Sequence, residues 1–185
     1  MNNQTLLKRI AIADALNELL RKKEIGSVRV QDVCTLSGVP RSTFYRYFYS
    51  LNDVSIWLFE YLLQLHFSDV HLSGSWQHAL ESLFCDMLKW KWLFYKFYNS
   101  PYPYDSIIDY ASRSAKEQFL KTAPKRLGRG LTADELLLID YHSCIQASLC
   151  AKWAKDGMTV PPQKMASVML EFLPSIMNEY ILRQA

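Results

Sequence analysis

The chain has 185 residues, of which 50% are hydrophobic and 21% are charged. This composition excludes a disordered protein, and no apolar run approaches the roughly 18 residues that a membrane-spanning helix needs. The net charge of +3 is too small to indicate a nucleic-acid partner by itself. Because Asp14, Asn17 and Glu18 interrupt the first apolar segment, no signal peptide is predicted, and we expect a cytoplasmic protein with no membrane partner.

The positive charge is concentrated near the N-terminus. Residues 1–53 hold eight Lys or Arg against five Asp or Glu, whereas residues 54–185 hold thirteen of each kind. A basic first third beside a neutral remainder is typical of a DNA-reading head joined to a body. Charge alone leaves an ordinary scatter of solvated side chains equally open.

The first third of the chain predicts three helices. Apolar residues recur with a helical period over residues 5–24, and Gly26 then offers a left-handed stop. A second helix is expected over residues 30–37, and a third from residue 40 or 41 to about residue 48, with Gly38 in the turn between them. Two short helices joined by two or three residues form a helix-turn-helix.

The remaining sequence predicts more helices and shows no β pattern. Ser50 and Asp53 resemble a capping box for a helix that ends near residue 67, and Thr132 starts a second, better-formed capping box. A break is expected over residues 124–130, and Pro174 should kink the last helix. Further helices are expected over residues 76–99 (one or two helices), 105–121, 132–155 and 161–183.

The expected fold is therefore all-α. It consists of a three-helix helix-turn-helix head in residues 1–50 and a helical bundle, called the body here, in residues 51–185. The four cysteines lie in apolar helix-like stretches and form no C-x-x-C pair, so we expect reduced core residues. No metal site and no cofactor are predicted.

The segment from residue 28 to residue 48, VRVQDVCTLSGVPRSTFYRYF, resembles the DNA-binding signature of the TetR family of transcription regulators. Phe44 and Phe48 lie one turn apart on the inner face of the third helix, so its other side chains point outward. At the start of a helix in the major groove, residues 41–43 can reach base edges, while Tyr45 and Tyr47 can donate to phosphates. The predicted DNA-binding residues are Arg29, Arg41, Ser42, Thr43, Tyr45, Arg46 and Tyr47.

Three positions depart from the family pattern. Arg29 stands where a Thr commonly caps the second helix, and Pro40 replaces the usual Ser before the recognition helix. Leu51 replaces a common Lys and so removes an expected phosphate contact. The resemblance implies a homodimer formed by the last two helices, which binds a palindromic operator in double-stranded DNA, most commonly as a repressor.

Aromatic residues crowd the segment from 90 to 104. They form either the wall of a pocket for a flat or apolar effector or plain core between helices. The candidate effector-binding residues are Trp90, Phe94, Tyr98, Tyr102, Tyr141 and His142. The segment from Trp153 to Met158, followed by Pro161, resembles regulators of dihydroxyacetone kinase operons, which implies the alternative of a body that binds a partner protein.

Other classes of function are less well supported. The sequence has no G-x-S-x-G, P-loop, G-x-G-x-x-G or H-E-x-x-H motif, so we predict no enzyme. A non-specific DNA-coating protein would need a larger positive charge, because such binding depends on phosphate neutralisation. The changes at Arg29 and Leu51 also leave open a dimeric module that has lost DNA binding.

Overall fold

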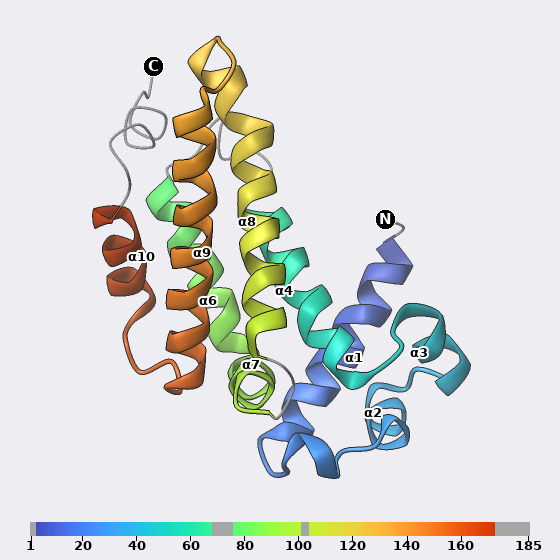
Figure 1. The fold of residues 1–185 in the computed structure, drawn as a ribbon. Helices are drawn as coiled ribbons and strands as arrows, with labels where there is room; N and C mark the ends of the chain where they lie inside the picture. The colour runs from blue at the N-terminus through green and yellow to red at the C-terminus, as the bar shows by residue number, and fades with distance from the viewer. Residues whose placement is uncertain (1–2, 68–75, 101–103, 173–185) are drawn as a thin grey trace.

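The structure is a computed structural model that describes residues 3–67, 76–100 and 104–172, and every regular element in these ranges is helical (Figure 1). The prediction of an all-α fold is confirmed. No helix in the described ranges is long and apolar enough to cross a membrane. The elements are α1 (Asn3–Leu20), η1 (Ile25–Ser27), α2 (Val30–Ser37), α3 (Arg41–Tyr47), α4 (Leu51–Phe67), α6 (Trp76–Lys89), α7 (Lys91–Tyr98), α8 (Tyr104–Leu127), α9 (Ala133–Lys155) and α10 (Pro162–Glu171).

The head contains the predicted helix-turn-helix. Gly38 ends α2 with a φ of 68°, a left-handed conformation that suits glycine, and α3 begins three residues later. The prediction for Gly26 is wrong, because this residue lies within η1 and is not among the glycines with positive φ. The chain leaves α1 through a short 3₁₀ turn, which needs only ordinary negative φ values.

The body is built around the antiparallel pair α8 and α9, the yellow and orange helices that lie side by side in Figure 1. α4 runs from the head into the body, where it packs on α6, α7 and α8, while α10 packs on α6. The part of the last predicted helix beyond residue 172, with its kink at Pro174, lies outside the described residues.

α8 continues past Pro124, although the sequence predicts a break from that residue onward. A proline removes one backbone donor and strains the preceding turn, but its own carbonyl still accepts. Here the Pro124 carbonyl accepts from the Gly128 N–H at 3.1 Å, so the helix closes another turn. It ends at Leu127, and the next residue, Gly128, supplies the stop with a φ of 67°.

The cysteine prediction is half right. All four thiols are free, and Cys34 and Cys150 are buried as expected. Cys85 and Cys144 are exposed, because they lie on the outward sides of α6 and α9. An apolar stretch of helix therefore does not by itself bury each residue in it.

Head and body are joined through polar contacts from α1 to the turn between α6 and α7. The Asn17 side chain donates to the Lys89 carbonyl (3.3 Å) and accepts from the Leu93 N–H (3.0 Å). Asn17 thus bonds a backbone carbonyl at the end of α6 and a backbone N–H at the start of α7, two groups that lack partners within their own helices. The Trp90 indole N–H donates to the Asp14 carboxylate at 2.7 Å and fixes the same turn on α1.

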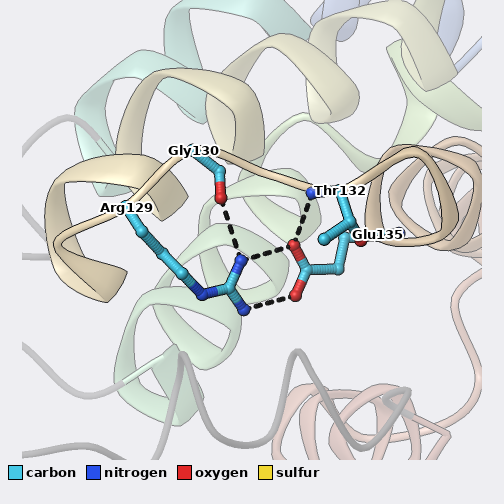
Figure 2. Close-up of polar contacts among 4 residues, drawn as sticks. All are labelled: Arg129, Gly130, Thr132 and Glu135. Carbon is cyan, nitrogen blue, oxygen red and sulfur yellow. Dashed lines mark hydrogen bonds and ion pairs between the residues drawn. The ribbon is translucent and has the colours of Figure 1, made fainter.

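The connection from α8 to α9 is held by the predicted capping box together with an arginine (Figure 2). The Glu135 N–H donates to the Thr132 hydroxyl (3.2 Å), and the Thr132 N–H donates to the Glu135 carboxylate (2.8 Å). Arg129 donates to both carboxylate oxygens, at 2.9 and 2.6 Å, and also to the Gly130 carbonyl. These bonds, those from Arg129 above all, lower the pKa of Glu135 from 4.5 to about 2.

We predict that Glu135→Gln lowers the free energy of unfolding at pH 7, because it removes the charge that Arg129 and the Thr132 N–H stabilise. A carboxylate with a depressed pKa in the folded state stabilises the fold above its ordinary pKa. The difference in the free energy of unfolding between wild type and variant should therefore shrink as the pH falls from about 4.5 towards 2. Urea unfolding at several pH values measures this difference, and Asp134→Asn in the same helical turn is the matched control.

Candidate nucleic-acid interface

α3 presents a polar surface because its apolar side chain, Phe44, is buried in the core. Phe44 has no exposed surface, and Phe48, just after the helix, is also buried. Around the anchor, Arg41, Ser42 and Arg46 are exposed and Tyr45 is 46% exposed. Thr43 and Tyr47 are half-buried, so six of the seven predicted DNA-binding residues lie together on one short helix.

Two arginine–tyrosine pairs organise this surface. Arg41 donates to the Tyr45 hydroxyl at 3.5 Å, and its guanidinium lies 5.6 Å from the centre of that ring. Arg46 forms a similar pair with Tyr47, at 3.3 and 5.2 Å. The bond to Tyr45 raises the pKa of Arg41, and the bond from Arg46 lowers the pKa of Tyr47. Each pair holds a permanent cation beside a phenol at the helix surface.

Arg29, the seventh predicted residue, is exposed and directly precedes α2. Its guanidinium has only donors, so it cannot accept the N–H that a threonine would accept there. The Asp32 carboxylate accepts from the Arg29 N–H at 3.1 Å, which satisfies the other half of the cap. Arg29 in place of a threonine therefore removes one hydrogen bond of the helix cap and adds a positive charge at the start of α2.

The departure from the family pattern at Leu51 is accounted for by packing at the start of α4. Leu51 is half-buried and packs against the core, so it serves as an apolar contact where the family pattern has a lysine. The Asp53 carboxylate accepts from the N–H groups of Tyr49 (2.9 Å) and Ser50 (2.8 Å), which completes the predicted cap. Pro40, at the start of α3, forms no side-chain cap.

Sequence reasoning missed two residues of α1 that lie beside Tyr47. Thr5 hydrogen-bonds to the Tyr47 hydroxyl, and the charge of the exposed Lys8 acts on the same group. Both contribute to the lowered pKa of Tyr47, after the larger effect of Arg46. Helical periodicity gave no signal for Lys8, because it lies one turn before the buried Ile12 on the same side of α1.

Arg9 connects α1 to the exit of the recognition helix. Its guanidinium lies 4.9 Å from the centre of the Phe48 ring and 4.4 Å from that of Trp57, and these two rings are 5.7 Å apart. Burial lowers the pKa of Arg9, and burial raises the pKa of Glu60, which faces the same open groove of about 310 Å³. The orientation of α3 thus depends on contacts with both α1 and α4.

Of the described candidate effector residues, three lie at successive turns of α7, counted from its N-cap, and two lie on α9. Phe94 and Tyr98 are buried in α7, while Trp90 is bonded to the head through Asp14. Tyr141 is 63% exposed on α9, and its neighbour His142 is buried. Tyr102 lies outside the described residues.

The body contains an apolar cavity of about 50 Å³ at a different place. None of the five described effector candidates is among its lining residues, although Phe119, which lines it, contacts the His142 ring edge-on. Helical periodicity could not reveal this cavity, because its walls come from five helices far apart in sequence. The larger lining side chains include Phe67, Trp76, Phe84, Phe119, Gln146 and Met169.

No protein-family model matches the sequence, and no curated protein matches it. Solved structures do match its fold. The dihydroxyacetone kinase operon activator DhaS is 14% identical, with a TM-score of 0.70 over 97% of this chain and 99% of that chain. A TetR transcriptional regulator from Rhodococcus sp. RHA1 is 18% identical, with a TM-score of 0.55 over 93% of this chain and 100% of the other.

A further similar structure is the TetR family repressor AlkX from Dietzia sp. Strain DQ12-45-1b. It is 15% identical, with a TM-score of 0.53 over 92% of this chain and 95% of that chain. These likenesses extend over the helix-turn-helix and the body together. The chain therefore has the all-α fold of TetR-family transcription regulators, as its N-terminal signature predicted.

Proposed function

We propose that this protein is a sequence-specific DNA-binding transcription regulator that places α3 in the major groove. The observation that carries the proposal is the exposed surface of α3, in which Arg41, Ser42, Tyr45 and Arg46 surround the buried Phe44. A recognition helix reads bases with its first residues and fixes its register through phosphates. The similarity in fold to known regulators supports this assignment.

Different residues of the surface have different roles in this proposal. Arg41 and Ser42, at the start of α3, contact base edges, and an arginine suits the O6 and N7 acceptors of guanine. Tyr45 and Tyr47 donate to phosphates. Arg29 and Lys8 add sequence-independent attraction to the backbone.

We further propose that the protein binds DNA as a homodimer through α9. In a two-fold dimer the same surface of each copy meets the other, so the surface must suit itself, and an apolar stripe does. Tyr141 and Ile145 lie one helical turn apart on such a stripe, next to the exposed Cys144. Five of the twelve exposed large hydrophobic side chains in the described ranges lie on α9, namely Leu136, Leu137, Leu138, Tyr141 and Ile145.

We propose that the signal is a small neutral effector, because the cavity in the body is apolar. At about 50 Å³ it is smaller than the roughly 150 Å³ of an engineered cavity that binds benzene, so binding must move its walls. Such movement would reach α4, which leads to the head. A second candidate is a body that responds to a partner protein, the alternative implied by the resemblance of the segment from Trp153 to Met158 to regulators of dihydroxyacetone kinase operons.

The direction of regulation is open to experiment because the similar proteins differ. DhaS carries the name of an activator and AlkX that of a repressor. We propose repression, the mode implied by the resemblance in the sequence. In the simplest form of repression the operator overlaps the promoter, and footprinting together with transcription in vitro tests this arrangement directly.

The central prediction is that the protein enriches a palindrome from randomised duplex DNA at near-physiological salt. The two recognition helices of a dimer meet half-sites about 34–36 Å apart, which sets the spacing within the palindrome. Sequencing of the bound fraction measures the enrichment. Equal binding of all sequences would favour a DNA-coating protein instead, and absence of binding at any salt concentration would refute DNA recognition.

Arg41→Ala and Lys8→Ala should weaken binding in different ways. Loss of a base contact at Arg41 should cost about 1–3 kcal/mol on the selected site and little on random DNA. Loss of a phosphate contact at Lys8 should weaken both equally and reduce the slope of log affinity against log salt by about 0.9. Titrations by fluorescence anisotropy measure both quantities.

Arg113→Ala, an exposed arginine of α8, is the matched control and should bind as the wild type does. Unchanged affinity for the selected site in both Arg41→Ala and Tyr45→Ala would refute the role of α3 in DNA recognition.

Ile145→Arg and Tyr141→Arg should each convert the dimer to a monomer, because a charge in an apolar two-fold interface is buried twice without a partner. Light scattering at micromolar concentration measures the mass. Leu65→Arg, on the exposed side of α4, is the control and should remain dimeric. A monomeric wild type would contradict the interface on α9.

A further inference from the structure

His142 carries a buried polar atom that the fold leaves without a bond. The residue is only 3% exposed, and its Nε2 has no hydrogen-bond partner among the described residues. Burying a polar atom without a partner is costly, so such atoms are rare and call for an explanation. The other buried polar side chains of α9, Glu135 and Ser143, are both bonded.

This histidine lies beside the apolar cavity. On α9 it precedes Gln146 by one turn and Cys150 by two, and both of these residues line the cavity. Its ring meets Phe119 edge-on at 6.0 Å, and Phe119 stacks parallel to Trp76 at 5.0 Å. His142 does not itself line the cavity, so its ring lies behind Phe119, one side chain away from the cavity.

The charge of the cavity limits what can enter. Its lining, as far as the structure describes it, contains no Asp, Glu, Lys or Arg, and its polar groups include the Gln146 amide, the Trp76 indole N–H and the Cys150 thiol. A charged ligand would lose its hydration there without gaining a counterion. Burial also lowers the pKa of His142 to about 4, so at neutral pH the imidazole is uncharged and keeps one nitrogen as an acceptor.

We propose that the ligand of this cavity is a small neutral hydroxylated aromatic compound. Its ring stacks against Trp76 and Phe119, and its hydroxyl donates to His142 Nε2 while it accepts from the Gln146 amide. The inference rests on the proposed effector response and specifies the ligand class for it. Because the cavity measures only about 50 Å³ and His142 lies outside its lining, the two stacked rings move apart when the ligand enters, and this movement brings His142 Nε2 within reach of the hydroxyl.

Phenol, toluene and benzoate are suitable probes, because they share a ring and differ in the group attached to it. Isothermal titration of the full-length protein at pH 7 should show phenol binding about tenfold more tightly than toluene, as one hydrogen bond to a buried acceptor would give. Benzoate should not bind. Toluene binding as tightly as phenol, or no binding by either, would overturn the proposed class.

His142→Phe should lose the preference for phenol and bind toluene and phenol within about twofold of each other. Gln146→Leu should reduce the same preference, and it serves as the second test if His142→Phe does not fold. His78→Phe makes the same replacement at an exposed site on α6, and should keep the tenfold preference. A preference that survives both cavity variants would overturn the roles of His142 and Gln146.

DNA titrations on the same samples separate this inference from the proposed function. Selective DNA binding without a phenol preference would overturn the ligand class and leave the regulator intact. A phenol preference without selective DNA binding would support the site and refute the regulator. Phenol that weakens operator binding in the wild type, but not in His142→Phe, would support both.

Discussion

The burial of Phe44 is the constraint on which the rest of the head depends. α3 has seven residues, and so short a helix is not stable in water by itself. Phe44 and Phe48 attach it to the core, and Arg9 covers the second ring together with Trp57. Once these apolar side chains face inward, the arginines and tyrosines between them have only the solvent side to occupy. The DNA-facing surface is thus a consequence of packing.

The same α1 that supports the recognition helix also holds the body in place. Asn17 satisfies backbone groups at the end of α6 and the start of α7, and Asp14 holds the Trp90 indole in the turn between them. α6 in turn supplies Trp76 to the wall of the cavity. A displacement of α6 therefore acts on α1 through hydrogen bonds that have little freedom to adjust. Such a contiguous set of contacts is one physical route by which two distant sites can be coupled.

Two buried polar side chains of α9, Glu135 and His142, differ in the hydrogen bonds that the fold gives them. The Glu135 carboxylate receives bonds from Arg129 and from the Thr132 N–H, and its ionised form stabilises the turn between α8 and α9. The His142 imidazole is neutral and one of its nitrogens is unbonded. The first group belongs to the architecture, since its hydrogen bonds hold the connection between α8 and α9. The second is a cost to the folded state that a bound ligand would remove.

The sequence by itself determined the features that depend on neighbouring residues. The helices, the left-handed turn at Gly38 and the capping box at Thr132 follow from local backbone chemistry, which is the same wherever such residues occur. Tertiary structure decided which faces meet: it placed Trp90 against the head and Tyr141 on the outside, and built the cavity from five helices. Periodicity shows which residues share a helical face, but the partner of that face is set by packing between segments distant in the chain.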